Sequence, residues 1–199
     1  LKKQYKLHKI LTMSEKIFEN LEDYSLSKKD RPKAQFEKVG VVGCGSMGQK
    51  ISILVASRGI EVIFIELSQE KIDEAINSIT KDLSYKAQNW GVTPGEMKGI
   101  LSRIKGTIDY KELANCDLVF ESILPLSTEN AKNIRKEVFK KIEQNISPKA
   151  IIATNSTTMA ITELASVLEH RDRCVSMHIS TTSPDAKLVE IAVSYTHLT

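Results

Sequence analysis

Three glycines and one carboxylate form the group of residues in this sequence that most clearly points to chemistry. Gly43, Gly45 and Gly48 follow the apolar run 38–42, and Glu66 ends the next apolar run, 23 positions after the first glycine. In this spacing the first glycine makes a tight turn, the second lets the backbone approach a pyrophosphate, and the third lets a helix pack close. The carboxylate can accept from both hydroxyls of an adenosine ribose and would repel a 2′-phosphate. The pattern therefore predicts a dinucleotide site for NAD.

The start of the helix behind the glycines supplies the rest of this predicted site. Free N–H groups at the first turn of a helix face an anion, and the helix dipole favours negative charge there. We therefore expect Ser46 and Met47, together with the glycines, to contact the cofactor.

A polar run follows a hydrocarbon run near residue 155. Residues 150–154 have the pattern of a buried strand, and Asn155 comes directly after them. The carboxyl ends of strands in an open sheet face the ligand crevice, so Asn155 is placed to bind a nicotinamide ribose or a substrate carbonyl. Alternatively, Asn155 or Ser156 caps the following helix. The spacing alone favours neither interpretation.

A histidine and a glutamate near the end of the chain offer acid–base chemistry. His178 ends the apolar run 174–178, and Glu190 lies in the next run, 187–193. An imidazole has an unperturbed pKa of about 6.5 and can take a proton near neutral pH. A carboxylate beside it would fix its tautomer and stabilise the imidazolium. The sequence does not show that the two side chains touch, and a structural histidine is the alternative.

Composition excludes several classes of protein. The 199 residues carry a net charge of +3, without a concentrated basic segment, so we expect no nucleic-acid partner. No apolar run approaches the ~18 residues that a membrane span needs, so we expect no membrane partner. Three widely spaced cysteines, Cys44, Cys116 and Cys174, argue against a disulfide framework and against a metal site. They indicate a reducing compartment, and we expect a cytoplasmic protein.

Short strands alternate with helices over residues 38–193. Strands are predicted at 38–42, 61–65, 104–108, 117–121, 150–154, 174–178 and 187–193, and helices at 46–58, 68–90, 94–102, 111–114, 130–144 and 161–168. The third helix begins with a capping box, Thr93 followed by Glu96. In the helix at 130–144, the residues expected to face inward are Ile134, Val138, Phe139 and Ile142. The fold class is α/β: a doubly wound Rossmann-type sheet with a long helical excursion, 68–102, inserted after its second strand.

The chain resembles the NAD-binding domain of the 3-hydroxyacyl-CoA dehydrogenase family, which includes 3-hydroxybutyryl-CoA dehydrogenases. The resemblance runs from about Lys38 to Val193. Four segments carry it in family order: Val-Gly-Cys-Gly-Ser-Met-Gly (42–48), Asp-Leu-Val-Phe-Glu (117–121), Ala-Thr-Asn-Ser-Thr-Thr (153–158), and Met-His (177–178) followed by Lys-Leu-Val-Glu (187–190). We therefore expect an NAD-binding domain at 38–193, preceded by an N-terminal arm and linker at 1–37.

The resemblance implies a reaction, the oxidation of (S)-3-hydroxyacyl-CoA to 3-oxoacyl-CoA with NAD as cofactor and acyl-CoA as substrate. His178 is similar to the family's general base, and Glu190 to the carboxylate that orients it. Asn155 matches a family amide near cofactor and substrate. Thr157 falls where the family has a serine hydroxyl that contacts substrate. Glu121 resembles a family glutamate on the nicotinamide side of the cofactor site.

The chain also departs from the family. After the histidine the family usually reads Phe-Phe-Asn-Pro, whereas this chain has Ile-Ser-Thr-Thr at 179–182. This change and Thr157 favour the alternative of a non-catalytic dinucleotide-binding protein that kept the fold. A lysine-dependent 2-hydroxyacid dehydrogenase would need a catalytic lysine on a Gly-rich helix after residues 150–154, which this sequence lacks.

We interpret both ends of the chain as foreign to the domain. Met13 is a plausible native start, so residues 1–12 are expected to be upstream read-through. Residues 194–199 do not continue the family pattern and are expected to be a non-native tail, so His197 is no ligand candidate. The family's all-helical second domain is expected to be absent, and the full-length parent to be a homodimer through that domain. The isolated chain is expected to bind NAD with little turnover.

Overall fold

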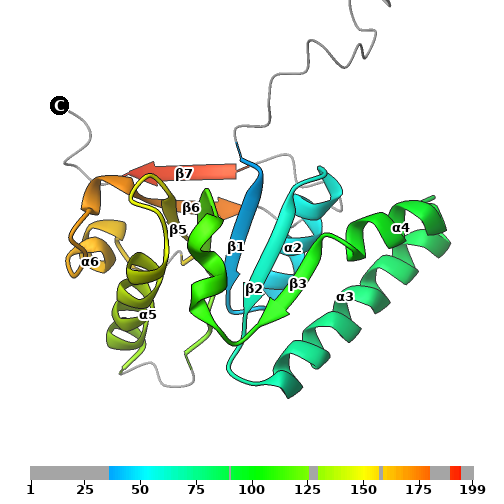
Figure 1. The fold of residues 1–199 in the computed structure, drawn as a ribbon, viewed down its shortest axis with the longest axis horizontal. Coiled ribbons are helices and arrows are strands. Elements are labelled where there is room, and N and C mark those ends of the chain that lie inside the picture. The colour runs from blue at the N-terminus through cyan, green and yellow to red at the C-terminus, as the bar shows by residue number, and fades with distance from the viewer. Residues whose placement is uncertain (1–35, 90, 126–129, 157–158, 180–188, 194–199) are drawn as a thin grey trace, which may run out of the picture. The chain divides into compact units, whose positions relative to one another are not determined.

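The computed structural model describes residues 36–89, 91–125, 130–156, 159–179 and 189–193. These residues build one seven-stranded sheet in the order β3-β2-β1-β4-β5-β6-β7, flanked by helices (Figure 1). The strands are β1 (Lys38–Val42), β2 (Glu61–Ile65), β3 (Ile104–Thr107), β4 (Leu118–Glu121), β5 (Ile151–Thr154), β6 (Cys174–Ile179) and β7 (Val189–Val193). The helices are α2 (Ser46–Ser57), α3 (Gln69–Asn89), α4 (Pro94–Leu101), α5 (Ala131–Asn145) and α6 (Ile161–Ala165), with 3₁₀ turns η1 (Tyr110–Asn115) and η2 (Arg171–Arg173).

Every neighbouring pair of strands is parallel except β6 and β7, which are antiparallel. Successive side chains of a strand point to opposite faces of the sheet. Val41 and Phe64 therefore pack with α2 and α3 in one core cluster, whereas Val119 and Ile152 pack with α5 and α6 in a second. Two cores on two faces of one mostly parallel sheet make the doubly wound arrangement that the sequence predicts.

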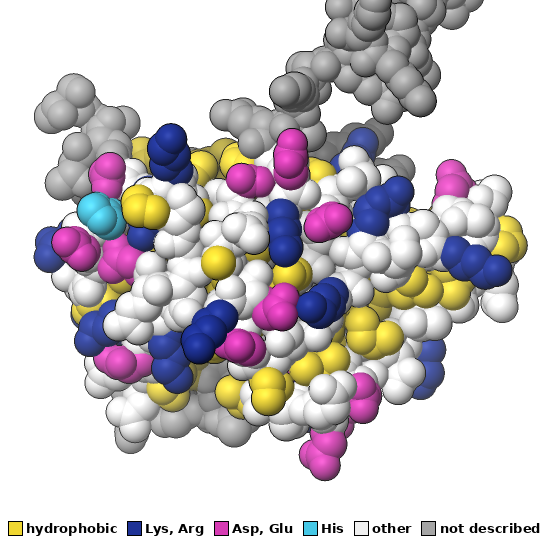
Figure 2. Space-filling view, in the orientation of Figure 1, with side chains coloured by type: hydrophobic (Ala, Val, Ile, Leu, Met, Phe, Trp, Pro, Cys, Tyr) yellow, Lys and Arg dark blue, Asp and Glu magenta, His cyan; other side chains and the backbone are white. Residues whose placement is uncertain are grey.

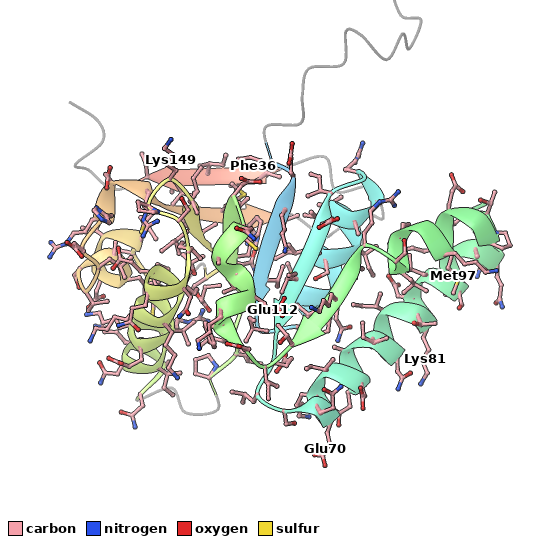
Figure 3. The ribbon with its side chains drawn as sticks, viewed as in Figure 1. Phe36, Glu70, Lys81, Met97, Glu112 and Lys149 are labelled. Carbon is pink, nitrogen blue, oxygen red and sulfur yellow. The ribbon has the colours of Figure 1, made fainter. Side chains whose placement is uncertain are left out.

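The amino ends of β1 and β5 and the carboxyl end of β2 can be located in Figure 3. Figure 3 labels Phe36 and Lys149, which precede β1 and β5, at the upper edge of the view, and Glu70, which follows β2, at the lower edge. The carboxyl ends of β1, β2 and β3 lie toward this lower side of the view (Figure 1). In Figure 2, positive and negative side chains are interspersed over the visible face, in agreement with the dispersed charge of the sequence.

Most of the predicted elements are confirmed. The excursion between the second and third strands forms α3 and α4. Thr93 caps α4 and Glu96 completes the capping box, because each side chain accepts from the other's backbone N–H. No helix within the described ranges is long and apolar enough to cross a membrane.

Three predictions about the elements are corrected. Ile134 does not face inward; it is 41% exposed, and Arg135 is buried in its place. The last helix ends at Ala165 rather than near residue 168, because the N–H groups of Ser166 and Leu168 bond only three residues back. Ile108 lies outside the third strand, which ends at Thr107.

Candidate functional site

The turn between β1 and α2 leaves no room for side chains at two of its glycines. Gly43 has a φ of +90°, which disfavours other residues, and a Cβ there would lie 2.9 Å from the Cα atom of Ile123. A Cβ on Gly48 would lie 2.1 Å from the carbonyl oxygen of Gly43. The helix therefore packs against the turn as closely as the backbone allows, as the glycine spacing predicts.

Gly45 differs from the other two because it faces open space. No heavy atom would lie within 4 Å of a Cβ at this position. No side chain caps the N-terminus of α2, and its first turn holds no acidic residue. Ser46 is exposed and Met47 is half-buried at the same turn. This end of the helix therefore presents N–H groups and a positive dipole end to an anion such as a pyrophosphate.

Glu66 lies against the glycine turn. One carboxylate oxygen accepts from the N–H of Cys44 at 2.6 Å, and the other accepts from the N–H of Leu67 at 3.2 Å. The side chain remains partly exposed. Each oxygen keeps a free lone pair, so the carboxylate is held in place and can still accept from ribose hydroxyls.

Three large apolar side chains are exposed at the same edge of the sheet. Leu67, Ile108 and Leu124 follow β2, β3 and β4 and are 95%, 61% and 89% exposed. Apolar side chains beside a few polar groups are typical of the lining of a small-molecule site. Sequence reasoning missed this feature, and its signal is a large apolar residue within three positions of each of three strand ends.

Glu121 is fully buried and is the centre of a polar network. Its carboxylate accepts from a guanidinium N–H of Arg135, from the N–H of Ile123 at 2.9 Å and from the hydroxyl of Thr154 at 2.6 Å. Glu121 and Thr154 are register partners across β4 and β5. Its contact with a cofactor stays a prediction.

The turn after β5 is tied to this network. The hydroxyl of Thr154 accepts from the N–H of Ser156 at 3.0 Å, and the N–H of Asn155 donates to the carbonyl of Glu121 at 3.0 Å. The residue that caps α6 is Ala160, without a side-chain bond, so the alternative that Asn155 or Ser156 caps this helix is wrong. The Oδ1 atom of Asn155 is buried and has no hydrogen-bond partner in the described part of the chain.

His178 and Glu190 lie directly opposite each other. They are register partners in the antiparallel pair of β6 and β7. Opposite residues of such a pair share a face, with Cβ atoms about 4.5–5.5 Å apart. Among the described residues, the Nδ1 atom of His178 is buried without a partner, and no ion pair joins the two side chains. The fold therefore brings together two groups whose proximity the sequence alone left open.

Two further residues belong to the account of the site: Thr157, which was predicted, and Arg135, which was not. Thr157 lies outside the described residues, as does the segment 180–188. Arg135 was missed, although it precedes the inward-facing Phe139 by one helical turn and belongs to the helix after the strand that ends in Glu121. Its signal was a cation at an inward position of an amphipathic helix.

The cysteines contribute no reactive thiolate. All three are free and buried. Burial raises the pKa of the Cys44 thiol, in the glycine turn, to about 12 and that of Cys174 to about 12. Thiols with such pKa values stay protonated near neutral pH. In the described ranges, no three His, Cys, Asp or Glu side chains gather in a manner that would hold a metal ion.

Comparison with known proteins agrees with this geometry. The family described as "3-hydroxyacyl-CoA dehydrogenase, NAD binding domain" matches residues 38–197. The chain belongs to this family. The cofactor of the 3-hydroxyacyl-CoA dehydrogenase NAD-binding domain is NAD, and the residues present fit it: the open Gly45 turn suits the pyrophosphate and the Glu66 carboxylate suits the ribose.

Two relatives from the 3-hydroxyacyl-CoA dehydrogenase family share about a third of the aligned sequence. The probable 3-hydroxybutyryl-CoA dehydrogenase of Deinococcus radiodurans is 33% identical over 158 residues, which cover 79% of this chain and 55% of that protein. The fatty acid oxidation complex subunit alpha of Psychrobacter sp. (strain PRwf-1) is 32% identical over 154 residues, 77% of this chain and 21% of that protein. The chain thus spans between about a fifth and about half of these relatives.

A solved structure shows the same fold. The (S)-3-hydroxybutyryl-CoA dehydrogenase PaaH1 of Ralstonia eutropha superposes with a TM-score of 0.72 at 27% identity, over 81% of this chain and 56% of that one. This similarity confirms the Rossmann-type fold class that the alternation of strands and helices predicts.

Proposed function

We propose that the protein oxidises (S)-3-hydroxyacyl-CoA to 3-oxoacyl-CoA with NAD⁺ as the hydride acceptor. The observation that carries this proposal is the register of β6 and β7, which sets Glu190 opposite His178 beside a buried Nδ1 atom that has no described partner. A histidine whose Nδ1 atom has no other hydrogen-bond partner, next to a carboxylate, is the arrangement of a general base and its orienting group. The names of the relatives support the substrate class.

The proton of the 3-hydroxyl goes to His178 in this proposal. The Glu190 carboxylate accepts from Nδ1–H, which fixes the tautomer with Nε2 free to take the proton. The same carboxylate then stabilises the imidazolium. Bound NAD⁺ would supply the hydride acceptor for C3, so that the C3–H bond breaks to the nicotinamide and the O–H bond breaks to His178 as the ketone forms.

Asn155 and Thr157 orient the substrate in this proposal. The buried Oδ1 atom of Asn155 is a hydrogen-bond acceptor without a partner among the described residues, so it can accept from a substrate hydroxyl. Asn155 follows β5 and His178 lies near the end of β6, so both are at the carboxyl ends of neighbouring parallel strands. Leaving such an atom unpaired is costly, so a bound hydroxyl would be held there by a hydrogen bond. The hydroxyl of Thr157 is assigned to the substrate by the resemblance.

The cofactor is held by the other half of the sheet. Gly43, Gly45, Ser46, Met47 and Gly48 would hold the pyrophosphate, and Glu66 would accept from the adenosine ribose. The exposed side chains of Leu67 and Leu124 lie on either side of the glycine turn, because β2 and β4 flank β1, and they suit the flat adenine ring.

Replacement of His178 by glutamine tests the assignment. We expect NADH formation from (S)-3-hydroxybutyryl-CoA to slow by about 10²–10⁴-fold, because proton transfer is lost. The dissociation constant for NAD⁺, measured by calorimetry, is expected to stay within about twofold, because the glycine turn is untouched. His170→Gln, an exposed histidine at the opposite edge of the sheet, is the matched control.

Two results would contradict this assignment. An unchanged rate of NADH formation in His178→Gln would show that His178 is not the general base. NAD⁺ binding with no NADH formation by the complete, unsubstituted protein, with its second domain, would favour the non-catalytic dinucleotide-binding alternative.

We also propose a cytoplasmic, homodimeric protein whose dimer contacts lie in a helical domain outside these residues. Three free, buried cysteines support a reducing compartment. The greater length of the relatives leaves room for such a domain. Sedimentation of the complete protein tests the assembly, and a monomer would overturn it; cell fractionation tests the location.

A further inference from the structure

The network around Glu121 is a buried polar cluster beside the proposed site, and the proposed reaction does not use it. Its members come from three elements: Glu121 ends β4, Thr154 ends β5, and Arg135 lies on α5. The Arg135 and Glu121 side chains are 10% and 0% exposed. A charge this deeply buried is costly unless it is paired and hydrogen-bonded, and the Glu121 carboxylate is both. The Nε atom of Arg135 is buried without a hydrogen-bond partner among the described residues.

We propose that Thr154 is a positioning residue, which Glu121 and Arg135 hold in one orientation so that the Asn155–Ser156 turn keeps its place in the site. The inference rests on the proposed function for its effect on turnover. The arrangement itself follows from the contacts of the described residues.

The direction of each hydrogen bond explains why the orientation of Thr154 depends on Glu121 and why the Ser156 N–H depends on Thr154. A carboxylate only accepts, so the Thr154 hydroxyl must donate its proton to Glu121. The lone pairs of that hydroxyl are then left to accept from the N–H of Ser156. Arg135 supplies the positive charge that stabilises the carboxylate in this role.

Arg135 extends the same network towards the glycine turn. A second guanidinium nitrogen donates to the carbonyl of Ile123 at 2.9 Å. Ile123 backs the turn so closely that a Cβ on Gly43 would meet its Cα atom at 2.9 Å. Both contacts of Arg135 are therefore with the segment at the end of β4, whereas Thr154 joins that strand end to the turn after β5. This difference makes Thr154 the sharper place for a test.

The experiment compares Thr154→Val, which removes the hydroxyl at nearly constant shape, with Thr154→Ser, which keeps it. Amide hydrogen exchange is followed residue by residue by NMR. In Thr154→Val the Ser156 amide is expected to exchange about tenfold faster, and Thr154→Ser is expected to restore its protection. The Asn155 amide is an internal control, because it donates to the backbone carbonyl of Glu121 and keeps that bond.

Binding and turnover separate positioning from stability. The NAD⁺ dissociation constant is expected to stay within about twofold in Thr154→Val, while kcat for NADH formation falls about tenfold and returns in Thr154→Ser. Thr80→Val removes a partly buried hydroxyl on α3, far along the chain from the network, and is expected to change none of these.

The outcomes are distinguishable from those for the proposed function. Unchanged Ser156 exchange in Thr154→Val overturns the inference, and so does an equal rise at the Asn155 amide, which would signify general loosening. If Ser156 exchange rises but kcat does not fall in an active enzyme, the turn does not position the substrate and the inference fails. Absence of turnover in the unsubstituted protein counts against the proposed function, and the exchange result still decides the network.

Discussion

Gly45 and Gly48 differ in what a methyl group would meet, and this difference separates cofactor binding from folding. We expect Gly45→Ala to weaken NAD⁺ binding by about tenfold or more, because its Cβ would occupy open space that suits a pyrophosphate. Its free energy of unfolding should change by less than about 1 kcal/mol, since its φ of −70° suits alanine. Calorimetry and urea unfolding measure the two effects.

Gly48→Ala is the matched comparison. Its Cβ would lie 2.1 Å from the Gly43 carbonyl oxygen, so α2 must move away from the turn. Overpacking of this kind costs about 1–3 kcal/mol. Equal loss of stability in the two variants would contradict the distinction between an open and a closed glycine.

Glu66 is expected to set the choice between NAD and NADP. In Glu66→Gln the side chain keeps its shape but loses the charge that repels a 2′-phosphate. We expect the ratio of NADP⁺ to NAD⁺ dissociation constants to fall about tenfold or more. Because the Cys44 N–H can still donate to the amide oxygen, the turn should persist. An unchanged ratio of the two dissociation constants would show that another residue determines the preference for NAD over NADP.

At the scale of residues, spacing predicted the glycine turn and its carboxylate because these roles depend on local chain geometry. Gly43, Gly48 and Glu66 lie within one strand–helix–strand unit, so their contacts are nearly fixed once that unit forms. The partners of Glu121 were not predictable in this way. Arg135 and Thr154 reach it from elements 14 and 33 positions away, and only the packing of α5 and β5 on β4 joins them.

At the scale of elements, α5 provides a test of which face is buried. Phe139→Ala should lower the free energy of unfolding by about 3–5 kcal/mol, because Phe139 is fully buried. Ile134→Ala should cost less than about 1 kcal/mol, since that side chain is 41% exposed. Urea unfolding measures both. A larger cost at Ile134 would restore the sequence prediction that it faces inward.

The error at α5 has a physical origin. Ile134 fits an apolar stripe with Val138, and hydrophobic periodicity alone prefers it to an arginine. The buried carboxylate of Glu121 reverses that preference, because an unpaired charge costs more than an exposed isoleucine. The antiparallel direction of β7 was equally hidden, since a strand pattern carries no information about its direction. Strand and helix limits were largely right because each apolar run is short and bounded by polar residues.

At the scale of the whole molecule, Glu143 links stability to pH. Burial alone would raise the pKa of its carboxyl, but the N–H groups of His170 and Glu169 and the Arg173 guanidinium outweigh burial and lower that pKa below its ordinary value of 4.5. The contribution to stability is therefore complete above the unfolded-state pKa and is lost as pH falls through the lower folded-state value.

We expect the melting temperature to fall on acidification below about pH 4.5 and to fall less steeply in Glu143→Gln. The reason is that the variant has no carboxyl to protonate at this junction of α5 with the segment before β6. Scanning calorimetry across acidic pH measures the slope. Glu61→Gln, at an exposed carboxyl on β2, is the control, and equal slopes in all three proteins would contradict the role of Glu143.

The order of the strands separates most of the residues proposed to bind NAD from those proposed to transfer the proton. The groups proposed to hold the pyrophosphate and the adenosine ribose follow β1 and β2, and only Leu124, proposed beside the adenine, follows β4; those proposed for proton transfer and substrate orientation belong to β6 and β7 and to the turn after β5. Only the pairing of β1 with β4 joins these halves within the sheet. Mutations that retune cofactor preference can therefore accumulate on one side without disturbing acid–base chemistry on the other, which makes the two traits separately evolvable and separately open to engineering.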